Sequence, residues 1–305
     1  MLINRLIKIP HILLPFLLIF SPLVVQAKIV TSIKPVAFIT EAIASGVIDT
    51  EVLLPDGASP HTYSLKPSDL LKLRSADLFI WVGEDMETFI PSVLQGIDSH
   101  KILELTENDQ IENLLLTSHS HHEEISHDHH HHHHGEFDNH IWLSPQIAEI
   151  TARLIHDKLI NLYPDKSSII DQNLENFLLE LKQTEQVIAK KLNNVQNKGY
   201  FVFHDSYGYF ETKFNLNNLG SFTINPSIQP GLKKIYEIQN ELKNKNAVCI
   251  FREPQFSPAI VNKLVDGTHV KVGELDPLGI DIVISKNAYC KFLLKITQQF
   301  LNCLE

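Results

Sequence analysis

The chain has 305 residues, of which 44% are hydrophobic, and a formal net charge of −10 with its 17 histidines counted as neutral. An acidic surface repels nucleic acid and anionic lipid but attracts cations, which argues against a nucleic-acid-binding function. The length is enough for two ordinary domains, each with its own core.

The first 27 residues have the pattern of a secretory signal. Arg5 and Lys8 precede the apolar run "ILLPFLLIF", and the segment ends with small residues at Ala27. A membrane anchor would need about 20 unbroken apolar residues, whereas Pro15 and Pro22 interrupt this run. We therefore expect cleavage after Ala27, export, and no direct membrane anchor. Without Arg5 and Lys8, 24 basic side chains oppose 36 acidic ones, a net charge of −12.

Beyond this segment, short β-branched or apolar runs alternate with amphipathic ones. The first expected helix, over 35–46, begins with Pro35 and ends with Gly46, as short helices often do. Strands are expected at 29–33, 50–54, 77–83 and 101–105, and further helices at 67–76 and 84–96. Strands separated by helices in this way predict parallel pairing with helices on both faces of the sheet.

A long helix is expected in the middle of the chain. A preceding helix starts near Pro145 and ends at Pro164. Residues 166–195 then contain no Gly or Pro, and their apolar side chains recur at helical spacing. This pattern predicts a helix about 45 Å long with one buried stripe, which we interpret as a rigid connector between two lobes.

The alternation of strands and helices resumes after this connector, so the predicted fold class is α/β, with two Rossmann-like lobes joined by one long connector helix. The expected organisation is a signal peptide at 1–27, a first lobe at 28–165, a connector at 166–196 and a second lobe at 197–305.

Residues 118–135 contain ten of the 17 histidines, far from either terminus, where a purification tag would normally lie. Residues 118–139 have only Ile125 and Phe137 as sizeable apolar side chains, so we expect a mobile loop. Neutral imidazoles can bind zinc weakly, and the alternative is a solvated loop with incidental affinity. The expected weak ligands are His119, His121, His122, His127, His129, His130, His131, His132, His133 and His134.

Three other histidines lie at expected strand ends. His61 follows the strand over 50–54, His204 directly follows "YFVF", and His140 begins "HIWLSP". In open α/β lobes, ligands bind beyond the carboxyl ends of the strands. Because His61 and His140 belong to the first lobe and His204 to the second, we expect an inter-lobe cleft to bring the three imidazoles together.

Asp276, in "GELDPLGID", is the best carboxylate candidate of the second lobe. Three imidazoles and one oxygen make a four-coordinate site that suits zinc, although copper and nickel also accept imidazole ligands. Manganese or calcium would favour more oxygen ligands. Taken singly, a strand-end histidine is more often a satisfied polar residue than a ligand, and Asp276 could simply cap a turn.

Three cysteines suit an exported protein with one disulfide and one spare thiol. A bond between Cys249, in the expected strand "AVCIF", and Cys303 would pin the C-terminal tail to the core. Pairing of Cys290 with Cys303 is the alternative, because connectivity cannot be read from spacing. If unpaired, Cys290 is expected to be a small buried residue.

A family resemblance strengthens the joint interpretation. It is carried by "LLPDGASPHTYSLKPSDL", "DLFIWVGEDMETF", "HIWLSPQIA", "GYFVFHDSYGYFE", "NPSIQPG", "EPQFSPA" and "LDPLG". Taken in this order along the chain, and together with the histidine-rich insert, these stretches resemble a family of zinc-binding proteins. The family comprises the periplasmic components of high-affinity zinc ABC importers, the ZnuA type. The resemblance runs from about Ile29 to Leu304 and implies two α/β lobes, a helical connector and one metal between them.

Carried over by position, His61, His140 and His204 match the three zinc histidines of this family, and the family's cysteine pair corresponds to Cys249 with Cys303. Some zinc receptors have an acidic residue just before the first histidine, where this chain has Pro60. Proline offers no ligand, so the fourth position is expected to be filled by Asp276 or water. Related manganese receptors have glutamate in place of the third histidine, so His204 favours zinc.

The resemblance implies a monomeric, non-enzymatic periplasmic receptor that delivers zinc to an inner-membrane ABC permease with its cytoplasmic ATPase. Two alternatives are a periplasmic metal-buffering protein that uses the histidine-rich loop and a zinc hydrolase. The hydrolase would need an open coordination position and a general base, and the sequence has no HExxH motif. Many equal weak sites would indicate storage, whereas one tight site with several weak ones would indicate import.

Overall fold

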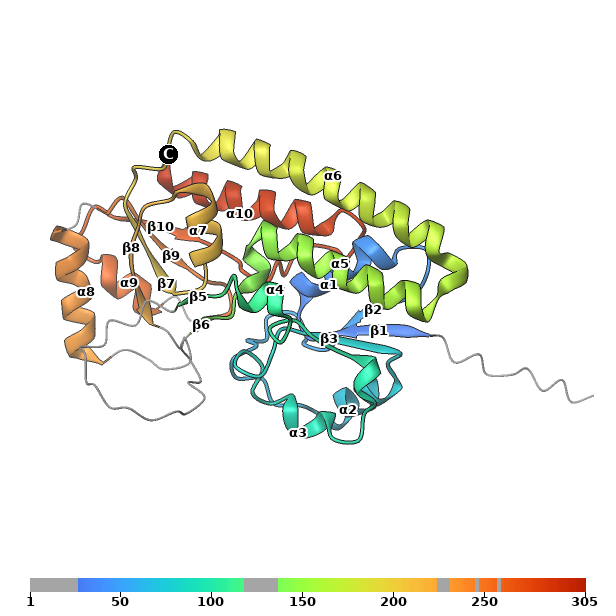
Figure 1. Cartoon of the computed structure of the whole chain (residues 1–305). Coiled ribbons are helices and arrows are strands. Elements are labelled where there is room, and N and C mark those ends of the chain that lie inside the picture. Colours follow the sequence, from blue (N-terminus) through green and yellow to red (C-terminus); the bar gives the residue numbers. More distant parts are fainter. Residues whose placement is uncertain (1–26, 118–136, 224–230, 245–246, 257–258) are drawn as a thin grey trace, which may run out of the picture.

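The computed structural model describes residues 27–117, 137–223, 231–244, 247–256 and 259–305. The expected signal peptide up to Gln26, the ten histidines of the insert and most of "NPSIQPG" lie outside these residues. Within them, two parallel sheets form two α/β lobes, and a long helix runs along both lobes (Figure 1). This arrangement confirms the predicted fold class. The exact domain boundaries remain predictions.

The two lobes share one strand order although no internal repeat is visible in the sequence. In each sheet the first strand along the chain lies between the second and the third, and the fourth lies at the edge. The first sheet has the order β2 (Asp49–Val52), β1 (Lys28–Thr31), β3 (Leu78–Trp81) and β4 (Ile102–Glu104). The second has the order β10 (Lys271–Glu274), β9 (Cys249–Arg252), β7 (Tyr200–His204) and β8 (Asn218–Thr223).

All neighbouring pairs in both sheets are parallel, as the alternation of strands and helices predicts. The helices of the first half are α1 (Lys34–Ala44), α2 (Pro67–Ser75), α3 (Pro91–Leu94), α4 (Asp109–Glu112) and α5 (Pro145–Leu162). Those of the second half are α7 (Gly208–Phe214), α8 (Leu232–Asn244), α9 (Ala259–Val265) and α10 (Ala288–Leu304). Short 3-10 turns occur at Ser99–Lys101, Ile141–Leu143 and Pro164–Lys166.

The long helix α6 (Ser167–Leu192) has 26 residues and lies within the expected connector. At a rise of 1.5 Å per residue it is about 39 Å long. Its buried stripe packs on α1, α5 and α10, and Phe177 contacts the ring of Tyr289 on α10. In Figure 1, α6 and α10 lie side by side along the top of the molecule. Helix α6 is thus the connector between the lobes that the sequence predicts, and α10 packs beside it against α1 of the first lobe and β10 of the second.

One apolar core continues from the first lobe into the second. It includes Ile29 of β1, Phe177 of α6 and Phe300 of α10, all at most 3% exposed. A smaller core, with Phe222 and Leu264, lies between the second sheet and helices α8 and α9. Because side chains from both lobes pack in the same core, a large movement of one lobe against the other would expose apolar surface.

The expected helix over 84–96 is shorter in the structure. Only α3 is helical there, and residues 84–90 form turns. The carboxylate of Glu87 accepts the backbone N–H groups of Val82 and Gly83 at 3.0 Å each. Burial raises the pKa of Glu87 to about 7. This side chain folds back on the start of the turn after β3, where the backbone N–H of Glu87 also donates to the carbonyl of Gly83 at 3.0 Å.

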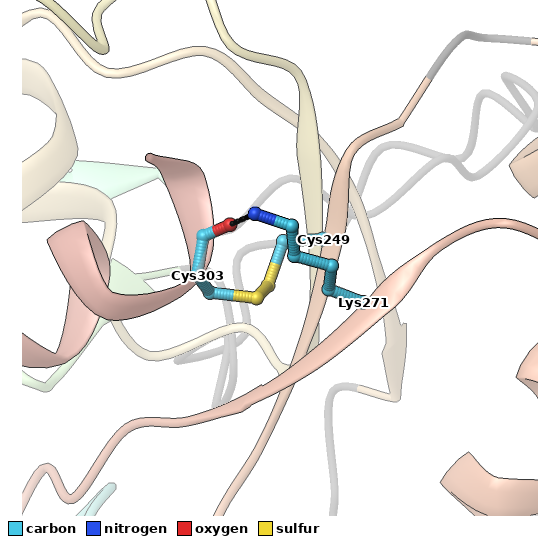
Figure 2. Close-up of a disulfide and its surroundings, with 3 residues drawn as sticks. All are labelled: Cys249, Lys271 and Cys303. Carbon is cyan, nitrogen blue, oxygen red and sulfur yellow. Dashed lines mark hydrogen bonds between the residues drawn. A yellow bond between two sulfur atoms is a disulfide. The ribbon is translucent and has the colours of Figure 1, made fainter.

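The disulfide joins Cys249 of β9 to Cys303 of α10, with the two Cα atoms 6.0 Å apart, and confirms the expected pairing (Figure 2). Lys271 of β10 donates from Nζ to the carbonyl of Cys303 at 3.3 Å, also shown in Figure 2. Cys290 is free and buried, as expected, and burial raises the pKa of its thiol to about 11. Its thiol is therefore protonated and unreactive at neutral pH.

Among the residues described, no helix combines the length and the apolarity that crossing a bilayer requires.

A histidine outside the expected metal site links the helices α5 and α6. His156 lies 2.8 Å from Asp157 through Nδ1 and 2.8 Å from Asp171 through Nε2. Burial would lower the pKa of His156, but hydrogen bonds and charge attraction from the two carboxylates outweigh it and raise the pKa above 6.5. Asp171 lies on α6, so the imidazolium joins the connector to its neighbouring helix.

Removal of the disulfide should destabilise the protein. The cysteines are 54 residues apart, and the chain-entropy estimate for a loop of that length is about 4 kcal/mol. The Cys249→Ala/Cys303→Ala variant should therefore unfold at a clearly lower urea concentration than the wild type. Reduction should lower the wild-type midpoint and leave that of the double variant unchanged. Equal midpoints for the two oxidised proteins would contradict a stabilising role for the bond.

His156 should make the stability depend on pH. Its folded pKa lies above the unfolded value, so the ion pairs stabilise the fold fully below about pH 6.5 and are lost as the pH rises through the folded pKa. The stability difference between the wild type and His156→Gln should be larger at pH 6 than at pH 9, measured by urea unfolding. The same difference at both pH values would show that the charge on His156 contributes nothing.

Candidate metal centre

Each of the three expected histidines is placed by a different element. His61 lies in the loop after β2, and its backbone N–H donates to Ser59 Oγ at 3.3 Å. His140 immediately precedes the 3-10 turn at Ile141–Leu143. His204 is the last residue of β7, at the carboxyl end of the second sheet. The positions of His61 and His204 agree with the rule that ligands bind beyond the carboxyl ends of parallel strands, whereas His140 lies outside both parallel sheets.

The structure brings the three imidazoles together. Nε2 of His61 lies 3.3 Å from Nε2 of His140, although the two residues are 79 positions apart. Ring centroids are 5.0 Å apart for His61 and His204 and 4.8 Å apart for His140 and His204. One ring nitrogen from each histidine lies within 4.8 Å of the others. A single ion could therefore contact all three rings.

The surroundings of this cluster are mostly apolar. Pro60, Trp142, Phe256, Pro277 and Leu278 line the same pocket as the three histidines. His140 and His204 are 6% and 3% exposed, and His61 is partly buried. Such walls lower the local polarity, so charge interactions between an ion and the imidazoles would be stronger than in bulk water.

Burial also controls the charge of the cluster. Burial, followed by repulsion from His140 and His204, lowers the pKa of His61 from its usual 6.5 to about 2. A metal ligand must offer a neutral imidazole, because a protonated ring has no free lone pair. The His61 ring is therefore neutral at pH 7 and ready to bind a cation.

A carboxylate orients His140. Asp138 Oδ1 lies 2.6 Å from Nδ1 of His140 and also accepts the backbone N–H of His140 at 2.9 Å. A carboxylate only accepts hydrogen bonds, so the Nδ1 atom carries the proton and Nε2 keeps its lone pair. Metal-binding histidines are commonly held in this way. The Nε2 atom, which lies beside His61, is thus the nitrogen available to a metal.

A second carboxylate lies beside His204. Glu253 Oε1 is 3.4 Å from Nδ1 of His204 but lacks hydrogen-bond geometry. The same oxygen accepts from Ser206 Oγ at 3.1 Å and from Tyr207 Oη at 3.2 Å. Both nitrogens of His204 are buried without a hydrogen-bond partner. Because an unpaired buried polar atom is costly, this ring fits a bound ion.

Asp276 is not part of the histidine group. Its carboxylate accepts the backbone N–H groups of the turn after β10, at 3.1 Å from Leu278, 3.1 Å from Gly279 and 2.7 Å from Ile280. Lys295 Nζ lies 3.6 Å from the same carboxylate. In this structure Asp276 holds the turn together, which is the turn-capping role that the sequence analysis gave as the alternative. Its role as a metal ligand remains a prediction.

Sequence reasoning missed Asp138 and Glu253. Asp138 is two residues before His140, a spacing that permits a side chain to reach the neighbouring ring. Glu253 directly follows β9, so the strand-end rule that selects His204 could also have selected it. No pattern of residue types, however, gives the direction of either carboxylate.

Two α/β lobes with three buried imidazoles at their meeting point define a metal-binding protein of the two-lobed receptor class. Residues 29–303 match the sequence profile of the family described as zinc-uptake complex component A, periplasmic. The chain belongs to this family, and the resemblance inferred from the sequence motifs is confirmed.

Two curated relatives illustrate the match. The chain is 47% identical over 292 residues to the high-affinity zinc uptake system protein ZnuA of Yersinia pestis, with 92% of each chain covered. It is 44% identical over 292 residues to the protein of the same name in Haemophilus ducreyi, with 92% of this chain and 94% of the relative covered.

Solved structures share the fold. A crystal structure of ZnuA has a TM-score of 0.76 at 24% identity and covers 92% of this chain and 100% of its own. A zinc-bound ZnuA with residues 138–173 of its own sequence deleted has a TM-score of 0.75 at 24% identity, covering 92% and 98%. The periplasmic zinc-binding protein TroA of Treponema pallidum has a TM-score of 0.77 at 19% identity, covering 92% and 99%. At these identities the likeness concerns the fold alone.

Proposed function

We propose that the protein captures zinc in the periplasm and delivers it to an inner-membrane ABC permease with its cytoplasmic ATPase. The observation that supports this most directly is the convergence of His61, His140 and His204 from both lobes. Three imidazole ligands in a mostly apolar pocket suit zinc. The names of the curated relatives, high-affinity zinc uptake system proteins, agree with this chemistry.

The proposal includes export. A leader that ends at Ala27 would place the chain in the periplasm, where relatives of this family act by the family's description. The first strand begins at Lys28, directly after the proposed cleavage site. Cleavage there would leave the fold intact, because β1 keeps all its residues. The docking surface for the permease is not assigned.

The hydrogen bonds of the two nearby carboxylates favour a binding role over catalysis. A zinc hydrolase needs a general base close to a metal-bound water. Asp138 already faces Nδ1 of His140, and Glu253 accepts from Ser206 and Tyr207. Both carboxylates are thus already engaged in hydrogen bonds with protein groups. We therefore propose a receptor and not an enzyme.

A buffering protein is the second candidate, since ten histidines of the insert could bind several ions. These residues lie outside the described part of the chain. In the described part of the chain, one group of at least three His, Cys, Asp or Glu side chains lies close enough to share an ion, and it consists of His61, His140 and His204. This favours one tight site for transport, with weaker binding in the insert.

Zinc titration of the chain without residues 1–27, in competition with a chelator, tests the ligand set. His61→Ala, His140→Ala and His204→Ala should each weaken zinc binding at the tight site at least about 100-fold. Loss of a residue that only hydrogen-bonds to a metal ligand commonly lowers metal affinity by about 10- to 100-fold, and loss of the ligand itself should cost more. His100→Ala, a change at an exposed position, is the matched control and should bind like the wild type. Many equal sites in the wild type would instead indicate storage.

The fourth position can be tested separately. The sequence predicts Asp276 or water, and the bonds of Asp276 to Leu278, Gly279 and Ile280 favour water. Asp276→Asn should keep zinc affinity within about threefold, because the three imidazoles remain, but should lower the urea midpoint because hydrogen bonds to a charged acceptor are lost. A loss of affinity as large as that of His204→Ala would identify Asp276 as a ligand.

A further inference from the structure

The carboxylate that orients His140 belongs to a small sheet between the lobes. Strand β5 (Leu116–Thr117) pairs antiparallel with β6 (Phe137–Asp138), and Leu116 lies opposite Asp138. Figure 1 shows this pair of strands between the first lobe and β7 of the second. Asp138 is therefore placed by this short sheet and not by either large sheet.

The second lobe anchors both strands through one phenol. Tyr209 of α7 donates from Oη to the carbonyl of Asp138 at 2.6 Å. The same oxygen accepts the backbone N–H of Leu116 at 3.1 Å. Tyr209 is only 5% exposed, so water competes little for these bonds. Loss of the hydroxyl would free β5 and β6 from the second lobe at the same point.

The glycine next to Tyr209 leaves room for the carboxylate of Asp138. A Cβ atom at Gly208 would lie 3.1 Å from Asp138 Oδ2. The absence of a side chain there allows the carboxylate to lie against the start of α7 while Oδ1 faces His140. The Asp138 and His140 side chains are 12% and 8% exposed. The carboxylate is thus enclosed between the ring that it orients and the second lobe.

From these contacts we propose that Asp138 and Tyr209 are positioning residues of the metal centre, with Tyr209 acting from the second lobe through Asp138 on His140. Asp138 keeps the proton of His140 on Nδ1 and leaves Nε2 for the ion. Tyr209 fixes the backbone that carries Asp138. The affinity of the site for zinc therefore depends on a lobe-to-lobe contact that includes no ligand. This inference rests on the proposed function.

Zinc affinity of the full mature chain, measured by chelator competition below one equivalent of zinc, tests the proposal. Asp138→Ala should weaken binding about 10- to 100-fold and Tyr209→Phe about 3- to 10-fold, in the range for residues that orient a metal ligand. Tyr200→Phe is the matched control. Tyr200 is also a buried tyrosine of the second lobe whose hydroxyl donates to a carboxylate, Glu211, at 2.8 Å, and this variant should bind zinc within about twofold of the wild type.

The double variant separates positioning from general stability. Because Tyr209 acts through the carboxylate of Asp138, Asp138→Ala/Tyr209→Phe should bind zinc no more weakly than Asp138→Ala alone. Additive losses, or equal losses in Tyr209→Phe and Tyr200→Phe, would overturn the proposal. The ¹⁵N shifts of the His140 ring in the zinc-free protein should show the proton on Nδ1 in the wild type and in Tyr200→Phe, but not held there in Asp138→Ala.

Failure of this inference differs from failure of the proposed function. If the wild type lacks one tight zinc site, the receptor role itself is wrong. If the wild type has that site and both Asp138→Ala and Tyr209→Phe retain wild-type affinity, only the positioning role is wrong. Asp138→Asn, which keeps an acceptor oxygen without the charge, should lie between the wild type and Asp138→Ala.

Discussion

The metal centre depends on the gathering of three largely buried imidazoles at one point between two lobes. A ring nitrogen that leaves water without a new partner costs free energy, and both nitrogens of His204 are in this condition. Protonation of the cluster does not remove this cost, because burial lowers the pKa of His61 to about 2 and charged rings would repel one another. A divalent ion would satisfy all three rings at once. The cluster is therefore poised for a cation, and its binding free energy would also stabilise the fold.

The framework around the cluster is stiff. Helices α6 and α10 lie together across both lobes, and one apolar core continues between them. Tyr289 of α10 donates to the carbonyl of Trp142 at 2.9 Å, which connects this framework to the segment that carries His140. Large closure would break such packing, so capture requires only small movements of side chains and loops. Under the proposed function, release would follow from a disturbance of the loops that carry His61 and His140, since α6 and α10 pack against both lobes.

Simple periodicity was enough to predict the fold, and strand ends made His61 and His204 candidates, but the joint ligand set with His140 rested on the family resemblance. Alternating strands and helices imply parallel sheets, and the carboxyl ends of those sheets select His61 and His204. Details set by hydrogen-bond direction were not predictable in this way. The turn that contains Glu87 replaces part of an expected helix, and Asp138 faces His140 because β6 is anchored by Tyr209. Such bonds depend on the final packing of distant segments, which no local pattern of residue types contains.

The most direct test of the central claim is a crystal structure of the zinc-loaded protein with anomalous diffraction recorded at the zinc edge. The account predicts one strong peak about 2.0–2.1 Å from an imidazole nitrogen of each of His61, His140 and His204. Zinc peaks elsewhere in the protein with none between these three rings would contradict the central claim. A peak within bonding distance of only one of the three rings would contradict it as well.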